Sequence, residues 1–215
     1  LRAAHDAEGL ANRKYALEGY LAPDTYRIFL SATSESIINT LLSQDNSVVD
    51  EVFYSDHREY YTDSEGTVQE VEKYQTMLNM DQSIILASII EKETGVPEER
   101  ADVAAVFINR LETGMKLQTD PTVIYALTKG KKDLGRPLYR KDLSVESPYN
   151  TYKYYGLPPG PICNPGREAI FAAVHPSDAD YLYFVASGTG GHRFARSLKE
   201  HNRNVSLYKK AMKKK

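Results

Sequence analysis

DQSIILASIIEKETG, residues 81–95, predicts the helix around which the rest of the chain folds. Four apolar residues recur at the spacing of one broad helical face: Ile85, Leu86, Ile89 and Ile90. At about 100° per residue, Glu93 falls roughly 80° from Ile85, in the middle of that face. Glu91 and Lys92 fall on its outer flank or beyond, where solvated charges belong. The segment therefore predicts a core helix that aims one carboxylate inward near its end.

A carboxyl group in apolar surroundings loses hydration in its charged form, so we expect the pKa of Glu93 to be raised. A raised pKa lets a carboxylic acid donate a proton near neutral pH, which is the property of a general acid. Two other readings stay open on the pattern alone. Glu93 pairs with an inward Arg or Lys, or the helix frays near Thr94 and Gly95 and turns Glu93 to solvent.

Two further helices are predicted directly after this one, and together the three surround Glu93. Gly95 fits the position just past a helix, and Pro97 with the acidic residues after it opens a second helix that Gly114 ends. Asp120 as N-cap and Pro121 at the first helical position open a third helix, which runs to Gly130. The short turns between the three helices predict compact packing.

The N-terminal third of the chain is predicted element by element. We expect a short charged helix over residues 1–18, a strand over 26–30, a helix capped by Thr33 or Ser34 that runs to about 54, a polar loop or altered helix over 55–67, and a short helix over 68–78.

The C-terminal part changes character. Residues 130–166 predict a long ordered loop whose interleaved Tyr and Asn residues line a cleft. A helix over 167–175, strands over 181–185 and 192–194 joined by the turn 187–191, and a final helix from 198 follow. The predicted class is α+β: a helical catalytic core with a small antiparallel β portion and long ordered loops. We divide it into an N-terminal part, 1–80, and a core, 81–215.

Composition bounds the function. The chain has 215 residues, 41% of them hydrophobic, and a formal net charge of only −2, so no global field favours nucleic acid. No stretch is long and apolar enough to span a membrane, and Cys163 is the only cysteine, which excludes an intrachain disulfide. The 16 tyrosines combine a flat apolar face with a hydroxyl, which suits polyhydroxylated ligands.

The sequence lacks the residue patterns that several kinds of chemistry require. The five histidines never occur at i, i+3 or i, i+4, so a metal site is poorly supported. The SGTGGH stretch lacks the order of a phosphate-binding loop, and no GxSxG elbow is present. Acid–base chemistry by Glu93 is what remains. A lone acid suits cleavage of a glycosidic bond, for which a hydrolase would need a second carboxylate such as Asp120. A lytic transglycosylase needs none, because the C6 hydroxyl of the substrate attacks.

Three long stretches carry a resemblance to a known family: SIIEKETGVPEERADVAAVFINRLETGMKLQTDPTVIYAL, SPYNTYKYYGLPPGPICNPG and HPSDADYLYFVASGTGGHRF, with EGYLAPDTY at 18–26 before them. In this order they resemble the MltG (YceG-like) family of membrane-anchored endolytic murein transglycosylases. The resemblance implies a lysozyme-like active-site helix and cleavage of the MurNAc-β-1,4-GlcNAc bond within nascent glycan strands, leaving 1,6-anhydro ends. A hydrolytic muramidase and a glycan-binding scaffold stay as alternatives.

The resemblance also implies roles for particular residues. It makes Glu93, the second Glu of EKET, the catalytic residue, and it implies a set of substrate-binding residues: Gln118, Thr119, Asp120, Tyr149, Asn150, Thr151, His192 and Phe194. Of these, Gln118 and Asn150 are expected to hydrogen-bond the sugars, and Tyr149 and Phe194 to present flat faces to them. No cofactor or metal is expected.

The resemblance finally implies a location and partners. The partners are peptidoglycan strands and, with them, peptidoglycan synthases and elongation or division proteins. Family members carry a single-pass membrane anchor and a LysM-like region upstream of the catalytic part. Because the chain begins with Leu1, we expect a fragment whose catalytic part acts on the extracytoplasmic side of the cell membrane.

Overall fold

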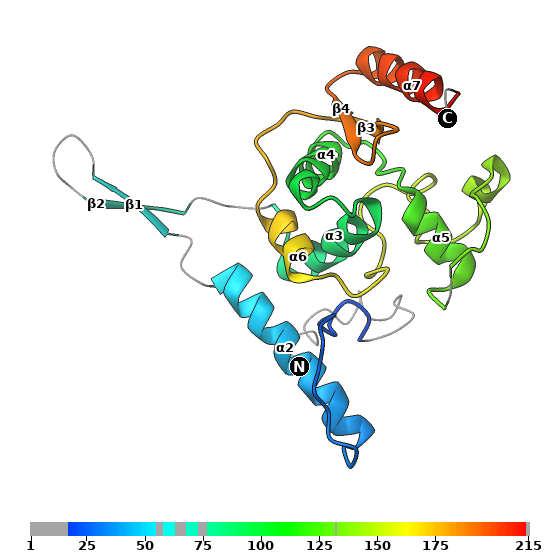
Figure 1. Cartoon of the computed structure of the whole chain (residues 1–215). Coiled ribbons are helices and arrows are strands. Elements are labelled where there is room, and N and C mark those ends of the chain that lie inside the picture. The colour runs from blue at the N-terminus through cyan, green and yellow to red at the C-terminus, as the bar shows by residue number, and fades with distance from the viewer. Residues whose placement is uncertain (1–16, 55–57, 63–67, 73–76, 132, 214–215) are drawn as a thin grey trace.

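The computed structural model describes residues 17–54, 58–62, 68–72, 77–131 and 133–213, and it shows a helical core with two small hairpins (Figure 1). The helix predicted at the N-terminus lies outside these residues, apart from its last two positions. The α-helices are α2 (Ser34–Tyr54), α3 (Met80–Glu93), α4 (Arg100–Glu112), α5 (Asp120–Thr128), α6 (Arg167–Val174) and α7 (Leu198–Met212). Two 3-10 helices, η2 (Pro97–Glu99) and η3 (Arg140–Ser144), accompany them.

Helix α3 is the centre of the core, as the sequence predicts. It begins with a capping box in which Asn79 and Gln82 satisfy each other's backbone N–H groups. All eight residues from Ser83 to Ile90 are buried, because α4, α5 and α6 pack around the helix. The prediction of one buried face is therefore too narrow, and the helix is covered on every side. Figure 1 shows α3 next to α4 and α6.

The helices after α3 follow their predicted signals closely. Pro97 opens a 3-10 turn that continues into α4, and Gly114 ends that helix in the left-handed conformation at φ 66°. Helix α5 starts one residue away from the predicted cap: Thr119 occupies the N-cap position, and Asp120 is the first helical residue. The Asp120 carboxylate accepts a hydrogen bond from Tyr152 instead of capping the helix.

The C-terminal hairpin forms where the sequence places it. Strand β3 (Tyr183–Ala186) pairs antiparallel with β4 (His192–Ala195), so that Ala186 lies opposite His192. Helix α7 starts with a capping box between Ser197 and Glu200 and packs on both strands. The long loop over 130–166 is ordered, contains η3, and buries several of its side chains against the core.

Three predictions for the N-terminal third are wrong, those for residues 26–30, 55–67 and 68–78. Residues 58–62, predicted as part of a polar loop or altered helix, form a strand. Residues 26–30 form no strand, because within the described ranges no neighbouring strand pairs with them. Residues 68–72 form strand β2 (Val68–Glu72), not a helix, and β2 pairs with β1 (Arg58–Thr62) from the polar segment before it. A short segment with little core contact takes the structure that its partner offers, and one sequence window does not reveal that partner.

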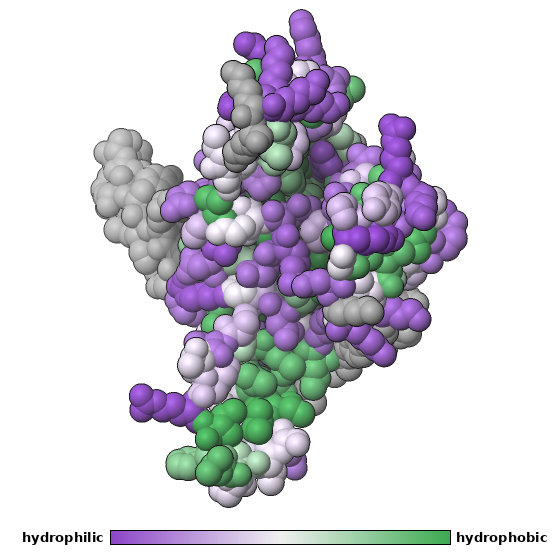
Figure 2. Space-filling view, turned by 45° about the vertical axis from the view of Figure 1, so that its right-hand side comes forward, coloured by the Kyte–Doolittle hydropathy of each residue, from purple (hydrophilic) through white to green (hydrophobic). Residues whose placement is uncertain are grey.

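Figure 2 shows a conspicuous apolar region at the end of the molecule formed by the start of α2 and the segment before it. Its exposed large side chains are Ile28, Phe29, Leu30 and Ile38. In the part of the chain that the structure covers, no helix combines the length and the apolar character that a membrane crossing requires.

Candidate active site

Glu93 is the last residue of α3. The helix ends there because Thr94 turns to an extended conformation at φ −135° and ψ 133°, while its N–H still bonds to the Ile90 carbonyl. Glu93 is partly buried, whereas the next side chain, Thr94, is 4% exposed. The helix holds its shape up to Glu93, so the fraying alternative does not describe this structure.

Thr119 links Glu93 to the start of α5. Its hydroxyl donates a hydrogen bond to Glu93 Oε1, and its backbone N–H donates to Thr151 Oγ1 over 3.1 Å. The Thr151 hydroxyl lies 2.8 Å from that of Thr122. The contact to Glu93 therefore rests on a buried row of three threonines, which fixes one carboxyl oxygen, while the other has no hydrogen-bond partner among the described residues.

The pKa of Glu93 is raised from 4.5 to about 7, mainly because burial removes water from the carboxylate. The Thr119 hydrogen bond lowers this pKa, the nearby charge of Asp120 raises it, and His192 and Arg110 lower it. A pKa near 7 allows the same group to give up and take back a proton at neutral pH. This is the electrostatic property that the sequence predicts for Glu93.

Arg110 is the inward cation near Glu93, yet its hydrogen bonds go elsewhere. It is 8% exposed; its Nε donates to the Leu182 carbonyl over 2.7 Å and its Nη1 to the Leu117 carbonyl over 2.6 Å. It thus ties α4 to the segments that lead into β3 and α5. The described residues contain no ion pair between Arg110 and Glu93 at salt-bridge distance, so the pairing alternative fails as well.

Three residues around this site are absent from the predicted site residues: Glu99, Arg110 and Tyr152, of which Tyr152 was predicted only as part of the loop that lines the cleft. Tyr152 donates its hydroxyl proton to Asp120 Oδ1 over 2.6 Å, and Glu99 contacts His192 at two points. Arg110 lies on the buried face of α4. A charged residue among apolar ones is a sequence signal that could have identified it. The other two are joined to their partners only by the fold.

The predicted substrate-binding residues divide by exposure. Gln118 and Asp120 are exposed, and His192 and Phe194 are partly exposed. Four others are buried: Thr119, Tyr149, Asn150 and Thr151. Phe194 stacks on Tyr181 with ring centroids 5.3 Å apart, so that residue already covers one ring face.

Asn150 shows what the buried members do. Its side chain is 0% exposed, its Nδ2 donates to the carbonyls of Leu143 and Val145, and its Oδ1 accepts from the Tyr152 N–H. Tyr149 is 6% exposed and packs on Tyr125 with ring centroids 4.7 Å apart. In this structure both side chains therefore hold the loop in shape.

Gln118, next to the site, has a strained backbone conformation. Its φ of 51° lies in the left-handed region that few non-glycine residues adopt, and its N–H donates to the Thr151 carbonyl over 3.2 Å. The turn lets the chain enter α5 with Thr119 aimed at Glu93 and leaves the Gln118 side chain exposed.

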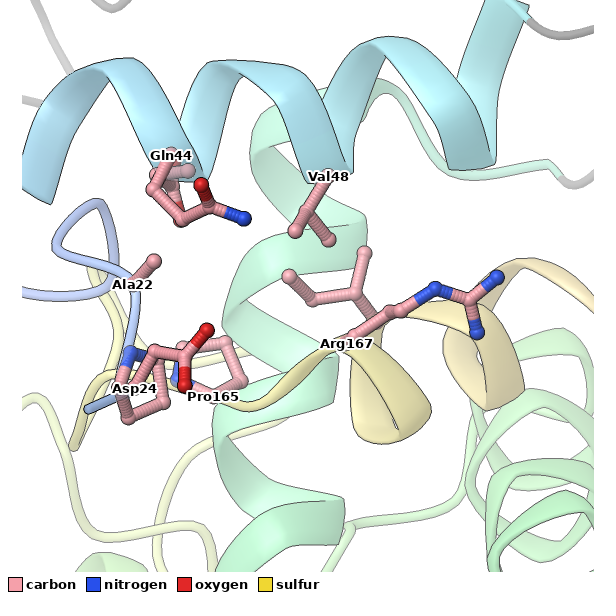
Figure 3. Close-up of a pocket in the computed structure, with 9 residues that line it drawn as sticks. Ala22, Asp24, Gln44, Val48, Pro165 and Arg167 are labelled. Atoms are coloured by element: carbon pink, nitrogen blue, oxygen red, sulfur yellow. The ribbon is translucent and has the colours of Figure 1, made fainter. Parts of the chain in front are cut away.

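A separate pocket lies between α2, α6 and residues 22–24 (Figure 3). Asp45 lines it, is 3% exposed, and has its pKa raised to about 6 by burial. The Arg167 guanidinium points away from Asp24 in Figure 3, and it pairs with Glu51 and Glu168. Glu93 does not line this pocket. Among the described side chains, no group of three His, Cys, Asp or Glu could hold a metal ion.

Comparisons with known proteins agree on one family. The sequence model of the YceG-like family matches residues 2–207. A protein of Bacillus subtilis named endolytic murein transglycosylase is 44% identical over 92% of this chain, and one of Streptococcus pneumoniae with the same name is 35% identical over 90%. The chain spans 49% and 32% of the lengths of these two relatives.

A solved structure shares the fold. The crystal structure of a yceG-like protein from Listeria monocytogenes matches with a TM-score of 0.71 and 34% identity, over 94% of this chain and 65% of that one. The mixture of helices and small antiparallel hairpins is therefore the α+β architecture predicted from the sequence.

Proposed function

Because the chain belongs to the YceG-like family, we propose that it is the catalytic part of an endolytic lytic transglycosylase that cuts peptidoglycan glycan strands. The observation that carries the proposal is Glu93: a partly buried carboxyl with a pKa of about 7, held by Thr119 at the end of the core helix. The relatives named endolytic murein transglycosylase support the substrate class.

The proposed reaction uses Glu93 twice. Protonated Glu93 gives its proton to the oxygen that links MurNAc C1 to GlcNAc C4, and the C1–O bond breaks. The resulting Glu93 carboxylate then takes the proton of the MurNAc C6 hydroxyl while O6 bonds to C1 and closes the 1,6-anhydro ring. Glu93 is protonated at the end as it was at the start, so the proposed reaction consumes no water and uses no cofactor. A pKa near 7 serves both steps, since neither protonation state is strongly disfavoured.

The exposed fractions of the other predicted site residues suggest that these residues have two different roles. We propose that the accessible side chains contact the glycan: Gln118, Asp120, His192 and Phe194. Thr119 holds Glu93, and the buried Tyr149, Asn150 and Thr151 hold the loop that supports Thr119. The membrane anchor and the partnership with peptidoglycan synthases and elongation or division proteins, which the resemblance implies, stay predictions.

A hydrolytic muramidase is the second candidate, and one observation favours it. Asp120 is exposed and lies near enough to Glu93 to raise its pKa, so the site holds two carboxylates. In a hydrolase, Asp120 would orient the attacking water. Against this, the Asp120 carboxylate already accepts a hydrogen bond from the Tyr152 hydroxyl.

The test is mass spectrometry of purified peptidoglycan digested by the chain and by two variants. We expect products lighter by one water than hydrolytic muropeptides, and we expect Glu93→Gln to lower their rate of formation by at least about 100-fold. Glu91→Gln is the matched control on the same helix: Glu91 accepts the Gly166 N–H, which an amide oxygen can also do, and its rate should match wild type. Circular dichroism checks that each variant folds.

Other outcomes would refute the proposal in distinct ways. Hydrated reducing ends that disappear in Asp120→Asn would establish hydrolysis. Binding of glycan strands without new chain ends would make the chain a scaffold. A folded Glu93→Gln variant with full activity would remove Glu93 from the chemistry.

A further inference from the structure

A carboxylate from another element is inserted against the turn that precedes β4. The His192 N–H donates to Glu99 Oε1 over 2.7 Å, and His192 Nδ1 lies 2.7 Å from Glu99 Oε2. Both oxygens of Glu99 are thus engaged by one residue 93 positions later in the chain. The two side chains are 17% and 18% exposed, so the pair is largely shielded from water.

The turn is shaped for this carboxylate. A Cβ atom at Gly191 would lie 2.2 Å from Glu99 Oε1, so a side chain there would have to displace Glu99. On the other side, the hydroxyl of Thr94 lies 3.5 Å from Glu99 Oε2, and Thr94 is the residue directly after Glu93. Glu99 therefore lies between the end of the catalytic helix and the start of β4.

This contact decides which ring nitrogen of His192 carries hydrogen. A carboxylate only accepts hydrogen bonds, so Nδ1 must donate, and the neutral ring then presents Nε2 as an acceptor. No hydrogen bond to Nε2 is found among the described residues, and Nε2 is not one of their buried unsatisfied atoms, so it is open to solvent. The edge contact with Phe184, at 5.2 Å and 84°, holds the plane of the ring.

We propose that Glu99 is a positioning residue that fixes His192 as a hydrogen-bond acceptor in the Glu93 site, where Nε2 receives a hydroxyl or acetamido N–H of the bound sugar. Thr94, the residue directly after Glu93, contacts Glu99 Oε2 at 3.5 Å, so Glu99 joins His192 to the end of α3 that bears Glu93. The inference rests on the proposed function for its substrate, but the state of the ring is independent of it.

Replacing Glu99 by Gln should reverse the tautomer. The backbone N–H of His192 can only donate, so the amide oxygen must face it and the amide NH₂ must face Nδ1. Nδ1 then has to accept, and Nε2 carries the hydrogen. Nitrogen NMR of ¹⁵N-histidine-labelled protein reads both ring nitrogens, and the resonances are assigned with His192→Asn. Wild-type protein should show hydrogen on Nδ1, and Glu99→Gln should show it on Nε2.

The same variant tests the role toward substrate. Glu99→Gln should lower kcat/KM on peptidoglycan by about 10-fold, the order expected for one lost hydrogen bond, with an unchanged melting temperature. His192→Asn keeps a donor for Glu99 but has no acceptor at the position of Nε2, so a similar loss is expected even if Glu99→Gln does not fold. Glu98→Gln is the matched control, since Glu98 is exposed on the same turn, and it should behave as wild type.

The two readouts fail separately. Hydrogen on Nε2 in the wild type, or the same tautomer in both proteins, overturns the positioning by Glu99. A reversed tautomer with unchanged kcat/KM overturns the role of His192 toward substrate. If the wild-type chain forms no anhydro ends, the proposed function falls, while the NMR result still decides what Glu99 does to His192.

Discussion

At the scale of single residues, Glu93 shows how the same surroundings set chemistry and stability. Burial raises its pKa to about 7, which is what the proposed acid–base role requires. Burial also means that folding binds a proton at this site, or desolvates a charge when no proton is available. The sign follows: the stabilisation is complete below the unfolded pKa near 4.5 and is lost as the pH rises through about 7.

Glu93→Gln should therefore raise the stability of the fold at pH 8 and change it little at pH 4.5. The difference between the folded and unfolded pKa of Glu93 limits this gain in stability to about 3 kcal/mol. The partial exposure of the carboxyl makes the gain smaller than that limit. Urea unfolding at the two pH values measures the effect. An equal change in stability at both pH values would show that ionisation of Glu93 does not destabilise the native state.

At the scale of elements, the site depends on how the segment before α2 is tied to the long loop. Gly19 donates its N–H to Asn164 Oδ1 over 2.6 Å and adopts a φ of 92°. A Cβ there would lie 2.3 Å from Pro161 Cγ. The loop is also bonded to α3, where the Ile162 N–H donates to the Ser88 hydroxyl over 3.0 Å.

Gly19→Ala should destabilise the fold by about 2 kcal/mol or more, from backbone strain plus overpacking. Gly156→Ala is the matched control: its φ is 81°, but nothing lies within 4 Å of its Cβ position, so about 1 kcal/mol of strain alone is expected. Chemical denaturation compares the two. A loss of equal size in both variants would mean that Pro161 gives way without cost.

At the scale of the whole molecule, opposing carboxyl groups set the pH dependence of stability. Arg136 lowers the pKa of Asp142 to about 2, and Arg167 lowers that of Glu51; both contributions are present at neutral pH and are lost as the pH falls through the lowered values. Asp45 and Glu93 act in the opposite direction, since burial raises their pKa to about 6 and about 7.

We expect the melting temperature to be highest near about pH 4, below which the lowered carboxyl groups lose their contribution, and to fall as the pH rises from there to about 7. The fall is reduced by His201, whose pKa is lowered by burial, so that its contribution grows as the pH rises toward 6.5. Melting curves from pH 4 to 8 test this, and the double variant with Asp45→Asn and Glu93→Gln should flatten the upper limb. A double variant with the wild-type profile would contradict the assignment.

The sequence by itself determined the core helix with Glu93 near its end, the helices on either side of the site, and the C-terminal hairpin. These elements depend on apolar periodicity, proline and glycine signals and capping residues that lie within a few positions of one another, so a single window contains the necessary information. The sequence motifs were also sufficient to identify the resemblance to the family.

Only the tertiary structure decided which side chains meet. It placed Thr119 on Glu93 across 26 positions and Glu99 on His192 across 93, it buried Asn150, and it paired β2 with β1 where a helix was predicted. No local pattern records such contacts, because their free energy comes from burial and hydrogen bonds between distant segments. That energy outweighs the small local preferences of the residues involved.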